Sequence, residues 1–435
     1  MNRFRAWMEF ALPKDSFRAD VATLMTGAAL GQFLLLAVSP LLTRLFAPAT
    51  FGAFGVYLSL AAIVGALSNL RFDQAIMLPK EAQAAARLFW AALLSAAVVA
   101  AGTLALCLLF FGRILSALNI QTLSAWILLL PLSVFFYGAS QALISWSTRR
   151  RKFARQSVSQ VARSLAIILV QVTAGVLRSG PGGLIGGAVA GDAVAALVLA
   201  WQVRREDGGV LRRERVWQKV KATAFQYRDF PIFSSPQNLL NAVSQNVPLL
   251  LLAKFFGPAV AGFYVLGVRC IQVPMNFLLT SLRQVFFQKA SATCNSGGDV
   301  YGLFRRATIG LLALVALPAA AVVAFGPGIF AFILGRQWAV SGEYARWLVL
   351  WLALMFANVP AVLFAQIYRK QRVVLLLDVL LLAARVLALV IGGLRGSPPL
   401  AIALFSLVGV AFNLFTILWA GNFLRKSRGA LPWAS

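Results

Sequence analysis

The chain has 435 residues, of which 60% are hydrophobic and 12% are charged, and its 40 Lys and Arg against 13 Asp and Glu give a net charge of +27. Soluble domains are nearer a quarter charged, so this composition excludes an ordinary soluble protein and is typical of a membrane protein. The absence of histidine excludes histidine metal sites and histidine general bases, and we predict no metal site, no catalytic residue and no cofactor.

Twelve apolar segments of roughly 20 residues follow one another, each long enough to cross ~30 Å of hydrocarbon. The predicted spans are residues 20–42, 51–70, 88–111, 125–146, 156–177, 182–203, 234–253, 262–282, 307–334, 347–368, 373–394 and 399–423. We therefore predict an all-α membrane protein with 12 transmembrane helices. The basic residues flank these spans and form no basic soluble domain, so we expect no nucleic-acid partner.

Positive charge alternates from one side of the predicted membrane to the other. Thirty of the Lys and Arg fall in alternate segments that begin with the N-terminal one, seven fall in the opposite turns, and three lie within spans. This bias places both termini in the cytoplasm. Residues 1–19 lack a small-residue cleavage site after a short apolar core, so we expect a retained cytoplasmic segment and not a signal peptide. Residues 424–435 form the cytoplasmic tail.

The two halves of the chain resemble each other. Residues 44–49 (RLFAPA) match residues 254–259 (KFFGPA) at an offset of 210, and residues 70–71 match residues 282–283 at an offset of 212. Chance recurrence of such turns at membrane edges is the alternative, but several matches in register favour a duplication. We predict parallel six-helix lobes around a central cleft, as in alternating-access carriers. The predicted parts are an N-lobe of residues 20–203, a cytoplasmic linker of residues 204–229 and a C-lobe of residues 230–423.

Charged residues within spans are costly, by about 2.5–3.5 kcal/mol at the centre of a helix, so they mark candidate sites. Arg385 lies about 12 residues into the eleventh span, ~18 Å deep, and Asp192 about ten residues into the sixth, ~15 Å deep. With Arg163 and Arg269, Arg385 predicts a cationic cleft for an anionic head group, because guanidinium matches phosphate geometry. The alternatives are snorkelling of Arg163 and Arg269 to the interface and a structural ion pair of Arg385 with Asp378 or Asp192.

The two intramembrane aspartates are candidates for binding the H⁺ or Na⁺ that would drive transport. Asp192 follows a small-residue stretch, residues 186–191 (GGAVAG), so the alternative is a buried polar contact between closely packed helices. Asp378 lies one to two turns inside the eleventh span, and its alternative is an interfacial position.

A polar stripe runs along the seventh span. Asn238, Asn241 and Gln245 stand at i, i+3 and i+7, on one face of a helix, and uncharged amides suit a sugar-bearing cargo. Their alternative role is hydrogen bonding between helices. Arg71, at the predicted inner mouth, is a candidate for contacting a pyrophosphate or a simple positive-inside anchor. The pair Glu206–Asp207 in the linker is expected to be a solvated loop.

Two regions carry a family resemblance. Residues 40–54 (PLLTRLFAPATFGAF), with residues 70–76 (LRFDQAI) and 78–80 (LPK), resemble the N-terminal signature of bacterial polysaccharide-biosynthesis flippases of the multidrug/oligosaccharidyl-lipid/polysaccharide superfamily. Residues 248–274, followed by residues 284–286 (QVF), resemble the start of that family's second half. After the arginine matching Arg71, the family often has tyrosine and glutamate. Here Phe72 and Asp73 keep the acid and lose the hydroxyl, which puts any role of that hydroxyl in doubt.

The resemblance implies a flippase of the bacterial inner membrane. Its cargo would be a polyprenyl-diphosphate-linked oligosaccharide for lipopolysaccharide O-antigen, capsule or exopolysaccharide, moved to the outer leaflet, with a polysaccharide polymerase and a chain-length regulator as partners. A multidrug/cation antiporter of the same fold is the first alternative, although it would need acids to dominate the cleft. A membrane glycosyltransferase or polymerase is the second, but the predicted outer turns hold Glu343 as their only acid, where such chemistry usually needs paired carboxylates.

Overall fold

The computed structural model describes residues 17–117, 121–295, 298–368 and 370–426. Within these ranges every regular element is a helix and there is no strand. Helices satisfy their own backbone hydrogen bonds, which a chain must do where lipid offers no partners. The predicted all-α membrane class is therefore confirmed. Most of the predicted cytoplasmic segments 1–19 and 424–435 lies outside the described residues.

The helices follow one another with short connections. In chain order they are α2 (Phe17–Leu45), α3 (Pro48–Gly65), α4 (Phe72–Ala75), α5 (Ala82–Ala117), η1 (Gln121–Leu129), α6 (Leu130–Arg149), α7 (Phe153–Val176), α8 (Pro181–Arg213), α9 (Trp217–Gln226), η2 (Phe230–Ser234), α10 (Ser235–Phe256), α11 (Pro258–Asn295), α12 (Val300–Leu334), η3 (Arg336–Trp338), α13 (Ala339–Ala357), α14 (Val359–Ile367), α15 (Gln371–Leu394) and α16 (Pro398–Lys426).

Eleven helical stretches of the described chain are long and apolar enough to cross a membrane, and residues 29–45 of α2 form a shorter apolar stretch. The chain is therefore a multi-pass membrane protein. The count of 12 spans and the side of each terminus stay predictions. α5 is kinked at Phe110, whose backbone angles leave the helical range.

The helices gather into two compact units, one ending at Lys254 and the other beginning at Phe255. Each unit has a core of its own. In the first, a cluster around Phe89 and Trp146 joins α5, α6 and α8. In the second, Phe304, Phe364 and Tyr368 pack together with the end of α16. The division after Lys254 differs from the predicted lobe boundaries at residues 204 and 230, which stay predictions.

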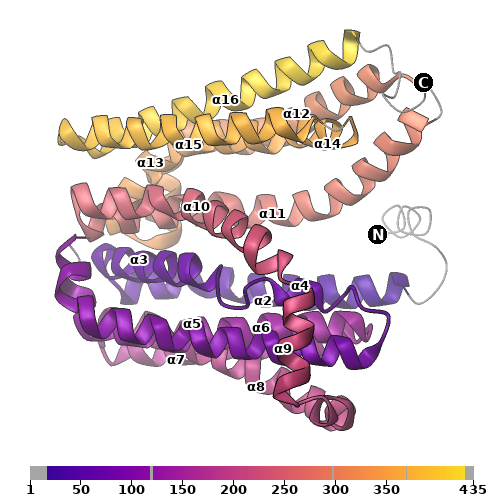
Figure 1. Cartoon of the computed structure of the whole chain (residues 1–435). Coiled ribbons are helices and arrows are strands. Elements are labelled where there is room, and N and C mark those ends of the chain that lie inside the picture. Colours follow the sequence, from indigo (N-terminus) through magenta and orange to yellow (C-terminus); the bar gives the residue numbers. More distant parts are fainter. Residues whose placement is uncertain (1–16, 118–120, 296–297, 369, 427–435) are drawn as a thin grey trace. The chain divides into compact units, whose positions relative to one another are not determined.

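Small residues allow the long helices of the first unit to pack closely. In Figure 1 these helices run side by side, whereas α9 crosses α5, on which it packs. α7 lies between α2 and α8. A Cβ atom at Gly31 would lie 2.8 Å from Ser164 Oγ, and one at Gly191 would press on the side chain of Ile167. The glycines therefore bring α7 close to both neighbours, and the polar residues of α7 and α8 come within reach of each other.

Candidate functional site

A polar cavity lies within the first unit, with a volume of about 390 Å³. Five helices contribute to its walls: α3, α6, α7, α8 and α10. Its polar lining residues are Ser133, Tyr137, Arg163, Asp192, Asn238, Asn241, Gln245 and Asn246. The rest of the lining is small or aliphatic, so the hydrogen-bonding groups are concentrated in a few side chains.

An ion pair joins α7 to α8 at the cavity wall. Arg163 Nε donates to Asp192 Oδ1 at 2.7 Å, with 34% of the Arg163 side chain and 18% of the Asp192 side chain exposed. The close packing at Gly191 explains the pairing, because a Cβ atom there would lie 3.1 Å from the carbonyl oxygen of Arg163. Among the described residues, the terminal amino groups of Arg163 have no acceptor, so they remain available to a ligand.

The amide row of α10 forms the facing wall. Asn238, Asn241 and Gln245 all line the cavity, as their helical spacing predicts, and Gln245 Nε2 donates to Asn241 Oδ1 at 3.0 Å. Asn241 and Gln245 are exposed, so they keep hydrogen-bonding capacity that is free for other partners. A wall of amides beside a guanidinium presents donors and acceptors to hydroxyl groups and donors to an anion.

Arg71 is tied to this wall through the loop after α3. Its backbone has φ of +62°, a left-handed conformation that costs energy for a residue with a Cβ atom. Arg71 Nη2 donates to Asn238 Oδ1 at 2.8 Å, and Asn238 Nδ2 donates to the carbonyl oxygen of Ala66 at 2.8 Å. Burial raises the pKa of nearby Asp73, although the charge of Arg71 acts in the opposite direction. The strained loop therefore points Arg71 at the amide row.

The second unit contains a different arginine site. Arg385, on α15, packs into the corner formed by two aromatic rings that meet edge to face, with its guanidinium carbon 4.1 Å from the ring centre of Trp351 and 4.5 Å from that of Phe405. Its buried Nε and Nη2 atoms have no hydrogen-bond acceptor among the described residues. Gly409 on α16 makes room for the guanidinium, since a Cβ atom there would lie 2.5 Å from Nη2.

The ion pairs considered for Arg385 do not form. Asp378 is exposed and makes no ion pair with a described residue, while Asp192 is paired with Arg163. Arg269 is half-buried on α11 of the second unit. The structure thus brings together Arg163, Asp192 and the amide row with Arg71 beside it, whereas Arg269, Arg385 and Asp378 belong to the other unit.

A family model described as "Polysaccharide biosynthesis protein" matches residues 41–343, more than half of the chain. The chain belongs to the polysaccharide biosynthesis protein family. The family resemblance that the sequence indicates is thereby confirmed. No curated protein sequence matches the chain.

Several solved structures share the fold of this family member. An inward-facing multidrug resistance MATE family transporter of the MOP superfamily is 15% identical at a TM-score of 0.64, over 93% of this chain and 96% of that one. The lipid II flippase MurJ, in an inward closed conformation, is 11% identical at 0.69, over 94% and 90%. A MOP superfamily transporter from Pyrococcus furiosus is 14% identical at 0.58, over 94% and 96%. The fold is that of MOP superfamily transporters.

Sequence reasoning missed three cavity residues of this family member. Asn246 stands eight residues after Asn238, and that spacing returns to the same helix face, so a longer reading of the stripe would have found it. Ser133 and Tyr137 stand at i and i+4 on α6 in an apolar run, and nothing in the sequence sets them apart from ordinary helix contacts.

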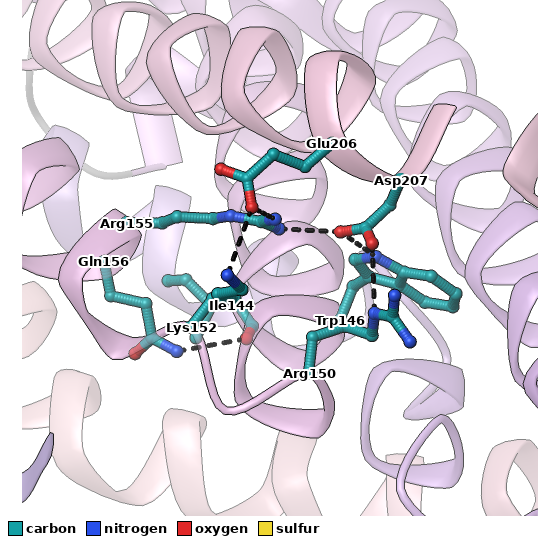
Figure 2. Close-up of polar contacts among 8 residues, drawn as sticks. All are labelled: Ile144, Trp146, Arg150, Lys152, Arg155, Gln156, Glu206 and Asp207. Atoms are coloured by element: carbon teal, nitrogen blue, oxygen red, sulfur yellow. Dashed lines mark hydrogen bonds and ion pairs between the residues drawn. The ribbon is translucent and has the colours of Figure 1, made fainter. Parts of the chain in front are cut away.

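The expectation of a solvated loop at Glu206–Asp207 is wrong. α8 continues through both residues to Arg213. Figure 2 shows Arg155 between the two acids, with Nη2 donating to Glu206 at 2.6 Å and Nη1 donating to Asp207 at 2.8 Å. Trp146 Nε1 and Arg150 Nε also donate to Asp207, whose side chain is only 3% exposed. This cluster, Trp146, Arg150, Arg155, Glu206 and Asp207, fastens α6, α7 and α8 together.

Proposed function

We propose that the chain is a flippase that moves a polyprenyl-diphosphate-linked oligosaccharide from the cytoplasmic to the outer leaflet of the bacterial inner membrane by alternating access. The oligosaccharide would be an O-antigen, capsule or exopolysaccharide unit, which a polymerase and a chain-length regulator would then take up outside. The family description, a polysaccharide biosynthesis protein, supports a cargo of this class.

The polar cavity is the observation that carries the proposal. Its amides match uncharged sugar hydroxyls, and Arg163 offers the donors that a diphosphate needs. Its one acid, Asp192, is neutralised by the ion pair, so the cavity of the described residues holds no free negative charge. MurJ, which shares the fold, is itself described as a lipid II flippase.

Arg385 supports an anionic cargo independently. A guanidinium held deep in a span normally meets an acid or a carbonyl group, because an unsatisfied buried donor costs about 1–3 kcal/mol. Two of its nitrogens lack such a partner in the described chain, and aromatic rings partly compensate for the lost hydration. We propose that these donors bind phosphate oxygens during the transport cycle.

Asp192 offers a means of coupling to an ion. When a diphosphate binds the free terminal amino groups of Arg163, the single positive charge is shared between two anions, so the Asp192 carboxylate is no longer fully neutralised and can accept a proton or Na⁺ from solution. The ion binds at the carboxylate while the diphosphate stays on the guanidinium, so cargo and ion occupy the cavity together. Asp378, exposed on α15, is the other proposed ion site.

A multidrug/cation antiporter is the second candidate, favoured by the fold shared with MATE transporters. A cationic drug would need an unneutralised acid in its pocket, whereas Asp192 is bound to Arg163. The Pyrococcus furiosus transporter of the same fold is described as having a binding pocket of reverse polarity that suggests a different function. Polarity of the pocket is therefore the property on which the two candidates differ.

The test uses the purified full chain in proteoliposomes that contain a fluorescent polyprenyl-diphosphate oligosaccharide. A membrane-impermeant quencher reports the fraction of lipid that has changed leaflet. We expect flipping by the wild type, at least a tenfold slower rate for Arg385→Ala, and an intermediate rate for Arg385→Lys, which keeps the charge but not the fork of donors. Arg395→Ala, at the end of the same helix and exposed, is the matched control.

Export of cationic dyes without lipid flipping would replace the proposal with the antiporter. Flipping at the wild-type rate by Arg385→Ala would keep the flippase and remove the role of that arginine. An equal loss in Arg395→Ala would mean that positive charge in general, and not the aromatic site, is responsible.

A further inference from the structure

A groove on the first unit combines apolar walls with an arginine-rich end. It lies between α5, α6 and α8, and its volume is about 550 Å³. Aromatic side chains from α5 and α6 form its walls, namely Phe89, Trp90, Phe135 and Phe136. It shares no lining residue with the polar cavity, and its lining contains neither an amide nor a hydroxyl side chain. The groove is therefore a separate feature with a different chemistry.

Three arginines line the polar end of the groove: Arg204, Arg212 and Arg215. A second hollow of about 420 Å³ continues from it along one face of α8 and shares Arg204, Gly208 and Arg212 with it. Gly208 opens the space between the two arginines of α8 because it has no side chain. The arginines thus surround a notch and are not scattered over a flat surface.

The nearby acids do not neutralise these arginines. Glu214 accepts from Arg87 Nε at 2.7 Å, and Glu206 and Asp207 belong to the cluster around Arg155. Within the described chain, Arg204, Arg212 and Arg215 have no carboxylate partner. Arg215 lies 5.1 Å over the ring of Trp90, a contact that leaves the edge of its guanidinium free. The end of the groove carries uncompensated positive charge.

Along α8 the groove is long enough to extend across the hydrocarbon of one leaflet and into its head-group region. From Leu197 to Arg212 the helix rises ~22 Å, and one leaflet contributes ~15 Å of hydrocarbon before the head groups begin. Leu197 is 64% exposed and Trp201, one turn further on, is 62% exposed. Tryptophan prefers the membrane interface, and the positive-inside rule places this end of α8 in the cytoplasm.

The helix α9 also indicates that the arginine end of the groove lies at the membrane interface. Its Val220 and Thr223 are buried, whereas Trp217 and Phe225 are exposed and Lys219 is on the surface. An exposed aromatic face with basic residues is typical of a helix that lies in the interface plane. α9 crosses α5 in Figure 1, and α5 also forms a wall of the groove.

We propose that this groove binds an anionic phospholipid of the cytoplasmic leaflet. The phosphate group lies among Arg204, Arg212 and Arg215, and one acyl chain lies against the aromatic walls. The charge selects an anionic head group, and the leaflet-deep apolar walls select an acyl chain over a free anion. An oligosaccharide head group finds no amide or hydroxyl partner here, so this lipid is not the cargo. The site stands whether or not the proposed transport activity is correct.

The test measures lipid binding to the full chain by native mass spectrometry, in a neutral detergent, with phosphatidylglycerol and phosphatidylcholine of identical acyl chains. We expect at least tenfold tighter binding of phosphatidylglycerol, weakened by salt because exposed charges are screened. The variant Arg204→Gln/Arg212→Gln/Arg215→Gln should lose at least tenfold in affinity. The matched control Arg305→Gln/Arg306→Gln/Arg425→Gln, which removes exposed arginines from α12 and α16, should lose less than twofold.

A second variant keeps the arginines and fills the groove. Ala200→Phe should weaken phosphatidylglycerol binding several-fold, while inorganic phosphate alone at equal concentration should not displace the lipid. Wild-type binding with and without salt remains informative if the triple variant fails to fold. Equal binding of both lipids, equal loss in both triple variants, displacement by inorganic phosphate, or preference for a polyprenyl diphosphate would each overturn the proposal.

Discussion

Substitutions at the ion pair between Arg163 and Asp192 can separate its contribution to stability from its contribution to transport. The pair is neither buried nor fully exposed, so breaking it should cost less than the 3–5 kcal/mol of a buried pair and more than the 0–1 kcal/mol of a surface pair. We expect Arg163→Gln and Asp192→Asn each to destabilise the chain by about 1–3 kcal/mol, because each leaves one charge unpaired in the cavity wall.

The neutral double variant Arg163→Gln/Asp192→Asn leaves no unpaired charge. It should recover about 1–2 kcal/mol relative to the sum of the two single variants, which a double-mutant cycle on unfolding measures. Transport should not recover. Loss of a charge-assisted bond worth about 1.5–3 kcal/mol to the diphosphate corresponds to a roughly tenfold to hundredfold loss at 1.4 kcal/mol per factor of ten.

The two assays use the purified chain: unfolding monitored by tryptophan fluorescence, and lipid flipping in proteoliposomes. Arg178→Gln, exposed just beyond the end of α7, controls for loss of one positive charge. A double variant that flips lipid within twofold of the wild type would refute a role of Arg163 in binding cargo. A coupling energy near zero would refute the ion pair itself.

Three further predictions concern packing and burial. Gly191→Leu should lower the unfolding midpoint strongly, because the new leucine side chain would enter the contact between α8 and α7. Gly186→Leu should be tolerated, because a Cβ atom there meets nothing within 4 Å. Equal midpoints for the two variants would refute the packing argument. Asp207→Asn should cost about 3–5 kcal/mol, because Arg150 loses its acid and the buried Arg155 keeps only Glu206. Glu206→Gln, at a half-exposed side chain, should cost less, and the reverse order in denaturant unfolding would contradict this. Arg385→Leu should change the free energy of unfolding by less than about 1 kcal/mol, because losing the cation–π contact and removing the unsatisfied donors offset each other. A large drop in the thermal unfolding midpoint would indicate that this arginine has a structural partner.

Features that depend on local pattern were predictable. The lengths of the apolar segments identify membrane helices because the thickness of the hydrocarbon sets the number of residues. The spacing of Asn238, Asn241 and Gln245 predicts a shared face because helical geometry is local, and all three line one cavity. The family could be recognised from two short stretches, and the match over residues 41–343 confirms it.

Partners across helices were not predictable. From the sequence, Asp192 was one of two aspartates that could pair with Arg385. In the structure Asp192 pairs instead with Arg163, which precedes it by 29 residues and lies on the neighbouring helix. Likewise, the acids at 206 and 207 follow an apolar span in a basic segment and look solvated, yet Arg155 is inserted between them.

Sequence by itself determined the helical membrane class and which polar residues share a helix face, because these follow from hydropathy and a fixed rise and turn per residue. Tertiary structure alone decided which charges meet, which guanidinium packs against aromatic rings and which helices enclose the cavity. Those outcomes depend on how closely two helices approach, and the contact of Gly191 with α7 sets that approach where Arg163 reaches Asp192.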